Sequence, residues 1–226
     1  MTSSTDNQGT PGAASAARKG TRPPGGSRRE RAAPKGGPSP RRAAPHFNQG
    51  ELLRRAGSFQ SAAESYRRAV ELNPGNAYYR YRLGDTLAAL GAVPTALDEL
   101  EVACALDPSN GFYRFRLGDL YARGNRLEEA AYHMREAACL SADDYYNLRL
   151  GLLYLRLGYA QEAVFALQQA VSLAPENPSH HYVLGDAYVR VGAERKALAH
   201  YRRAGSLGDF DVGGVERLRR QSAGAG

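Results

Sequence analysis

Histidine and cysteine have the widest chemical reach of the side chains in this chain, because they ligate metals, transfer protons and act as nucleophiles. The residues of these two types are His46, His133, His180, His181, His200, Cys104 and Cys139. None stands at a metal-ligand spacing from other His, Cys, Asp or Glu residues, and no glycine-rich phosphate loop or G-x-S-x-G turn is present in the sequence. We therefore expect no metal, no cofactor and no catalysis.

Arginines near the N-terminus could bind phosphate groups. Residues 1–45 contain nine basic and two acidic residues and so carry the whole formal charge of +7. The candidate phosphate-contacting residues are Arg28, Arg29, Arg31, Arg41 and Arg42. Such a cluster attracts nucleic acid or an anionic membrane through counterion release, although no aromatic ring lies among these arginines to stack on bases. The alternative interpretation is a solubilising tail.

The same segment lacks the residues that build a core. Residues 1–45 hold seven of the twelve prolines and no Leu, Ile, Val, Phe or Tyr. Such a composition cannot bury enough apolar surface to fold, so residues 1–45 are predicted to be a disordered leader. The sequence shows no secretory signal, and its two cysteines form no CxxC pattern, which favours a reduced, cytoplasmic protein.

The remainder of the chain repeats itself at a nearly constant interval. A segment ending on Leu-Gly, rich in aromatic residues and arginine in its first three copies, recurs four times. Its glycines are Gly84, Gly118, Gly151 and Gly185, and an earlier copy without the leucine ends at Gly50. A period of about 34 residues is typical of helix-pair solenoids, in which each unit buries its apolar face on its neighbours.

Small residues and prolines recur within each unit. An alanine follows every repeat glycine by twelve positions, and a second alanine follows seven positions later. Proline closes three of the units, at Pro74, Pro108 and Pro175, where it stops the second helix. The third unit is one position short and ends without proline, so its junction with the fourth is expected to differ.

The Leu-Gly pair, the two spaced alanines and the closing proline together resemble the tetratricopeptide repeat (TPR) family. The resemblance covers about residues 43–209 and implies an all-α, right-handed α-solenoid of five helix-turn-helix repeats. We assign the repeats to residues 46–209, a C-terminal capping helix to 210–221 and a disordered tail to 222–226. Residues Val212, Val215 and Leu218 would lie on one face of that capping helix.

One departure from the family pattern concerns its early tryptophan, which is Arg80, Arg114, Asn147 and His181 in the four clear repeats. We predict that the residue one position earlier takes over, as a substitute, the contact between repeats that the tryptophan makes in the family. This residue begins a stripe whose members are four, four and three positions apart, a spacing that fits one buried helix face. The stripe comprises Tyr79, Leu83, Leu87, Leu90; Tyr113, Leu117, Tyr121; Tyr146, Leu150, Tyr154, Leu157; and His180, Leu184, Tyr188, Val191.

A second stripe is offset from the first, and the resemblance implies that it lines a concave groove that binds a peptide or helix of a partner protein. The groove residues are predicted to be Tyr78, Tyr81, Arg82, Asp85, Phe112, Phe115, Arg116, Asp119, Tyr145, Leu148, Arg149, Tyr182 and Asp186. Aromatic residues and arginine are enriched at binding hot spots, so a segment with apolar side chains and some negative charge would suit this surface.

Two alternatives stay open at this level. The pairs Arg82–Asp85 and Arg116–Asp119 could neutralise each other within one helix and contribute only about 0.2–0.5 kcal/mol each. The protein is expected to be a non-catalytic interaction scaffold or adaptor, and the alternative is a nucleic-acid- or membrane-associated factor anchored by its leader. The oligomeric state is left undetermined by the sequence.

Overall fold

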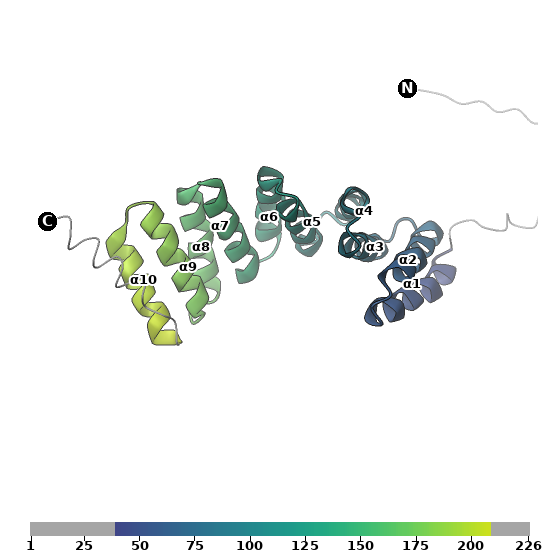
Figure 1. Ribbon diagram of the computed structural model, residues 1–226, viewed down its shortest axis with the longest axis horizontal. Coiled ribbons are helices and arrows are strands. Elements are labelled where there is room, and N and C mark those ends of the chain that lie inside the picture. Colours follow the sequence, from purple (N-terminus) through teal and green to yellow (C-terminus); the bar gives the residue numbers. More distant parts are fainter. Residues whose placement is uncertain (1–38, 209–226) are drawn as a thin grey trace, which may run out of the picture. The chain divides into compact units, whose positions relative to one another are not determined.

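The structure, a computed structural model, describes residues 39–208 as ten α-helices arranged in five antiparallel pairs (Figure 1). Each odd-numbered helix packs on the even-numbered helix that follows it, and each even-numbered helix packs on the first helix of the next pair. The helices are α1 (Pro40–Arg55), α2 (Phe59–Leu72), α3 (Ala77–Ala89), α4 (Val93–Leu106), α5 (Gly111–Arg123), α6 (Leu127–Leu140), α7 (Asp144–Leu157), α8 (Ala160–Leu173), α9 (Pro178–Arg190) and α10 (Glu194–Leu207). The predicted all-α array of five helix pairs is confirmed, and the predicted capping helix and tail lie outside the described residues.

Helix α1 begins earlier than the sequence suggested. It starts at Pro40, so the leader boundary predicted at residue 45 falls inside α1 and is wrong. The composition of residues 1–45 had predicted disorder, yet Pro40 occupies the first turn of a helix, where a backbone N–H has no helical partner to lose. Ala43 is fully buried, and the backbone N–H of Ser39 donates to the carbonyl of Leu72 at 2.6 Å. Packing on α2 therefore holds this turn despite Pro45.

The first helices of pairs two to five begin at side-chain caps. The side chains of Asn76, Asn110 and Asp143 each accept a hydrogen bond from the backbone N–H three positions later, and Asn177 caps α9 in a similar way. Each cap satisfies one of the free N–H groups at a helix start. The short junction before α7 thus keeps a cap although it lacks the closing proline.

The repeat glycines allow the two helices of a pair to cross closely. A Cβ atom placed on Gly118 would lie 2.9 Å from Met134 Cγ and 3.1 Å from the carbonyl oxygen of Ala130. A side chain on the second helix occupies the same place against the other repeat glycines, namely Tyr66 against Gly50, Leu100 against Gly84, Leu167 against Gly151 and Tyr201 against Gly185. At all five glycines the nearest atom would lie within 3.0 Å of the added Cβ, so a larger residue would require the opposing side chain or the helix itself to move.

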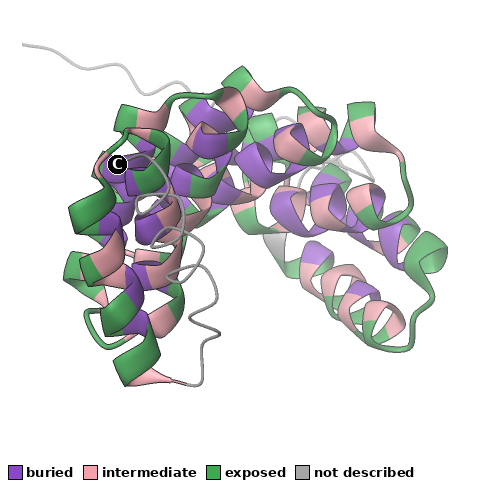
Figure 2. Ribbon diagram, turned by 60° about the vertical axis from the view of Figure 1, so that its left-hand side comes forward, coloured by how far each residue is buried: buried purple, intermediate pink, exposed green. Residues whose placement is uncertain are grey.

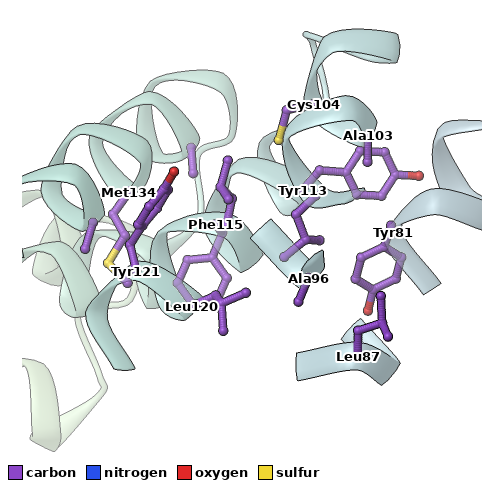
Figure 3. Packing of buried hydrophobic residues seen from close by; sticks show 14 of the residues in the cluster. Tyr81, Leu87, Ala96, Ala103, Cys104, Tyr113, Phe115, Leu120, Tyr121 and Met134 are labelled. Carbon is purple, nitrogen blue, oxygen red and sulfur yellow. The ribbon is translucent and has the colours of Figure 1, made fainter. Parts of the chain in front are cut away.

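Aromatic stacking joins the first three pairs to their successors. Each contact pairs a ring on one first helix with the substitute residue on the next: Phe47 with Tyr79 at 4.5 Å, Tyr81 with Tyr113 at 5.4 Å, and Phe115 with Tyr146 at 4.6 Å between centroids. Figure 3 shows Tyr81, Tyr113 and Phe115 within the buried cluster. The predicted substitute is confirmed, but its partners include Tyr81 and Phe115, which we had assigned to the groove.

The predicted buried stripe is largely correct. Figure 2 shows the buried positions turned toward neighbouring helices, and most stripe residues are buried or partly buried there. Leu90 is the exception, because α3 ends at Ala89 and Leu90 lies at its exposed C-cap. The chain turns at this residue, so the helical periodicity no longer decides where its side chain points.

In the second and fifth repeats, the residue in place of the family tryptophan pairs with the second helix of the same repeat, nineteen positions later. Arg80 forms an ion pair with Glu99 at 2.8 Å, and His181 Nδ1 lies 3.0 Å from His200 Nδ1. In the third repeat, Arg114 and His133 hold the two corresponding positions. Burial, and then the positive charge of Arg114, lower the pKa of His133. The corresponding pair in the fourth repeat is Asn147 and Ala166, both too short to bridge the two helices. Buried side chains form two hydrophobic clusters, which divide within this same repeat.

Gly118→Leu should destabilise the array by about 1–3 kcal/mol or more, because the side chain would overpack the crossing of α5 and α6. The matched control is Gly75→Leu, where an added Cβ meets no atom within 4 Å and which should change stability by at most about 0.5 kcal/mol. Urea unfolding followed by circular dichroism measures both variants. Equal midpoints for the two would contradict the proposed constraint.

Stability should decrease as the pH falls below about 6.5, the ordinary pKa of histidine. Burial and then the neighbouring His181 lower the pKa of His200, so between the two values the unfolded chain binds a proton that the folded chain does not. The slope should reach at most about 1.4 kcal/mol per pH unit for this residue.

His200→Asn, whose amide can still donate to His181, should make unfolding less dependent on pH even if it lowers stability at every pH. Urea unfolding of both proteins between about pH 5 and 8 makes the comparison. The partly buried His133 stays in both proteins and supplies the remaining slope, since burial lowers its pKa also. Identical pH profiles would exclude the His181–His200 contact as a source of the dependence.

Candidate functional site

The predicted groove residues divide into exposed and buried sets. Tyr78, Phe112 and Tyr145 are 46, 41 and 48% exposed and lie at the starts of α3, α5 and α7. Tyr81 and Phe115 are only 7 and 6% exposed, because they pack against the next repeat. The exposed rings form a row on what we call the first-helix surface, the surface formed by the odd-numbered helices.

The predicted arginines and acidic residues form ion pairs between repeats. Each arginine reaches an acidic residue on the preceding first helix: Arg82 with Glu51 at 2.5 Å, Arg116 with Asp85, and Arg149 with Asp119 at 2.8 Å. The alternative pairs within one helix, Arg82–Asp85 and Arg116–Asp119, are therefore wrong. Residues three apart do face each other on a helix, but the stacked neighbour offers a closer carboxylate.

Glu51, which the sequence analysis missed, is the acidic partner at the N-terminal end of this series. Burial opposes its ionisation, but hydrogen bonds from Tyr66 and Arg82 outweigh that effect and lower its pKa. Burial and the hydrogen bond to Glu51 raise the pKa of Tyr66 to about 12. Glu51 stands one repeat period before Asp85, so the periodicity could have identified it. These charges are satisfied within the protein, and they bind repeats to each other.

The series of ion pairs ends at α9. The repeat positions that would hold the next pair are Leu152 on α7 and Val183 on α9, both apolar. Asp186 on α9 instead accepts a hydrogen bond from the hydroxyl of Tyr201 at 2.5 Å. Leu148 and Tyr182, also predicted for the groove, are partly buried against the second hydrophobic cluster. The surface between α7 and α9 is thus more apolar than the surface that precedes it.

Two cavities open on the first-helix surface beside α7. One of about 470 Å³ is lined by Leu152, Leu155, Arg156, Asp186, Val189, Arg190 and Tyr201. The other, of about 330 Å³, is lined by Ala122, Met134, Arg149, Leu152, Leu153 and Arg156. Because Leu152 and Arg156 line both, we treat the two as one site, the α7/α9 groove.

Two exposed arginines border the α7/α9 groove without a carboxylate partner in residues 39–208. Arg156 donates to the side-chain oxygen of Asn125 at 3.4 Å, and Arg190 donates to the backbone carbonyl of Leu155 at 3.5 Å. Arg123 holds the same repeat position on α5, but it pairs with Asp119 at 2.8 Å. The sequence analysis missed Arg156 and Arg190, although their separation by one repeat period marks them as equivalent positions.

The arginines predicted to contact phosphate are only partly within the described residues. Arg41 and Arg42 lie exposed on the first turn of α1, whereas Arg28, Arg29 and Arg31 lie outside the described range. Phosphate binding by the leader therefore stays a prediction.

Residues 39–208 contain neither a candidate metal site nor a helix able to span a membrane. No three His, Cys, Asp or Glu side chains in this range gather closely enough to hold a metal ion. No helix in the same range has the length and apolarity needed to cross a membrane.

Comparison with solved structures finds the same fold in other proteins. The crystal structure of MamA protein is 22% identical with a TM-score of 0.67, over 73% of this chain and 91% of that one. MamA 41-end from Desulfovibrio magneticus RS-1 is 24% identical with a TM-score of 0.64, over 73% and 94%. YrrB, described as a TPR protein with an unusual peptide-binding site, is 21% identical with a TM-score of 0.64, over 80% and 91%.

Comparison with curated proteins gave no match. Two family models, both of the tetratricopeptide repeat, match residues 47–111 and 145–177. These ranges include Leu-Gly segments, spaced alanines and closing prolines on which the resemblance was based, and the ten helices pair as such repeats require. The chain therefore contains tetratricopeptide repeats, matched at residues 47–111 and 145–177.

Proposed function

We propose that this protein is a non-catalytic interaction scaffold that binds a segment of a partner protein on its first-helix surface, centred on the α7/α9 groove. The observation that carries the proposal is the conjunction of an apolar floor with two arginines that no carboxylate neutralises among the described residues. YrrB, which shares the fold, is described as having a peptide-binding site, and this supports peptide binding as the use of the present fold.

The chemistry of the groove favours a segment that carries both apolar side chains and a carboxylate. Leu152, Leu155 and Val189 supply apolar contact area, which stabilises binding by about 25 cal/mol for each Å² removed from water. Arg156 and Arg190 can donate paired hydrogen bonds to a carboxylate of the segment. Asp186 is already occupied by Tyr201 and would repel a second acidic group placed next to it.

The row of exposed aromatic rings extends this surface toward the N-terminal repeats. Tyr78, Phe112 and Tyr145 present apolar rings whose rotation is restricted by packing on Phe47, Tyr81 and Phe115. Rings held in this way lose little conformational entropy on binding, so an extended segment could continue from the groove along them. Tyr81 and Phe115 support these rings from below; they are packing residues and are not the contacting ones.

Random peptides selected on the full chain by phage display should be enriched in Asp, Glu or a free C-terminal carboxylate next to apolar residues. Arg156→Glu combined with Arg190→Glu should weaken binding of the selected peptides about tenfold or more, because like charges then meet in the groove. Fluorescence anisotropy with synthetic peptides gives the dissociation constants.

The control is Arg67→Glu combined with Arg68→Glu, which makes the same charge change at exposed positions of α2, in the first repeat. This control should leave peptide affinity within about twofold, since screening weakens charges that lie more than about 10 Å from the site. Equal loss in both double variants would point to non-specific attraction. Unchanged affinity in the groove variant would overturn the assignment of the site.

A further inference from the structure

A further cavity lies between α6 and α8, on a surface that the proposed function does not use. It has a volume of about 730 Å³. Its floor is Asn147, Leu150 and Tyr154 on α7, and its walls carry Arg135 on α6 and Phe165 on α8. A cavity of this size accommodates a large side chain from another molecule. We call it the α6/α8 pocket.

The sequence explains why a pocket opens at this repeat. In the second and fifth repeats, the residue in the tryptophan position is long and reaches the second helix, as Arg80 does to Glu99 and His181 to His200. In the fourth repeat the pair is Asn147 and Ala166, and Asn147 instead turns to donate to the carbonyl of Asp143 at 2.9 Å. The space that the other pairs occupy is left open between α6 and α8.

A phenylalanine stands at the edge of this pocket. Phe165 is 66% exposed, and the exposed Leu173 at the end of α8 lines the same pocket. Full burial of a phenylalanine side chain stabilises by about 1.5–3 kcal/mol, so an exposed ring beside an open apolar pocket indicates an interaction surface. The projecting ring and the pocket that could receive it lie on the same surface.

Charges on the two walls are opposite in sign. Arg135 on α6 and Glu162 on α8 both line the pocket, and neither forms an ion pair within residues 39–208. If two copies pack together through this surface around a two-fold axis, the α6 wall of each copy faces the α8 wall of the other. Arg135 of each copy would then contact Glu162 of the other, which gives two ion pairs in the dimer. The surface therefore carries both a projecting ring and a pocket that could receive it, and both a positive and a negative side chain. Such a surface is complementary to a second copy of itself.

We propose that the α6/α8 pocket is a homodimer interface, in which Phe165 of each copy enters the pocket of the other and Arg135 pairs with Glu162 across the two-fold axis. Residues 1–45 are a poor occupant, since they contain no Leu, Ile, Val, Phe or Tyr to fill an apolar pocket and carry excess positive charge. The dimer leaves the α7/α9 groove free, because the two sites share none of their lining residues.

Sedimentation velocity of the full chain over a concentration series should show a mass that rises from 24.4 kDa toward twice that value. Phe165→Ala should raise the dimer dissociation constant about tenfold or more, as expected for loss of a central aromatic anchor. Phe59→Ala, the same truncation at an exposed phenylalanine on α2, should leave it unchanged.

Charge reversal provides the sharper experiment. Arg135→Glu and Glu162→Arg should each weaken self-association about tenfold or more, because two repulsive contacts replace two attractive ones. When the two single variants are mixed, every chain of one variant meets opposite charges on the other, so heterodimers should form with affinity near that of the wild type. Their recovery also shows that both variants are folded.

A mass of 24.4 kDa at every concentration would overturn the proposal. It would likewise be overturned by a dimer that the Phe165 and charge variants leave intact, which would place the interface on another surface. Failure of the mixed variants to associate, with wild-type circular dichroism for each, would rule out the proposed pairing of Arg135 with Glu162.

Discussion

The close crossing of two helices at a glycine is the constraint on which the rest of this structure depends. At each repeat glycine, a side chain of the second helix occupies the space of the missing Cβ. That contact fixes how the two helices of a pair lie, and therefore which residues each pair presents to the next. The stacked rings, the ion pairs and the grooves all follow from this one geometry, because every repeat presents equivalent positions in equivalent places.

Three kinds of side-chain pair connect the helices: stacked aromatic rings, arginine–carboxylate ion pairs, and the pair at the tryptophan position within a repeat. The ion pair and the tryptophan-position pair are both replaced at the fourth repeat. Stacked aromatic rings and arginine–carboxylate pairs connect the first helices of the first four repeats. At the junction of the fourth and fifth repeats, Leu152 and Val183 replace the ion pair, and within the fourth repeat Asn147 and Ala166 replace the pair at the tryptophan position. Both proposed binding sites lie where one of these side-chain pairs is absent. The space that the pair would fill is then open to another molecule.

Part of the candidate site could be predicted from the sequence, and the reason for each failure is physical. Periodicity identified Tyr78, Phe112 and Tyr145 as equivalent positions, and all three rings are exposed, because residues at one repeat position share one environment. It could not separate them from Tyr81 and Phe115, which lie one turn further along the same side of the helix. Only the neighbouring repeat, which covers those two rings, distinguishes an exposed aromatic residue from a packed one.

The sequence by itself determined the all-α class, the five helix pairs, the close crossings and the position of the tryptophan substitute. Each of these depends on contacts within a repeat or on its period, and both are written directly in residue type and spacing. The tertiary structure alone decided that Arg82 pairs with Glu51, that Pro40 starts a helix, and that cavities open beside Arg156 and Phe165. Those outcomes depend on the distance and angle between elements far apart in the chain, which residue spacing does not encode.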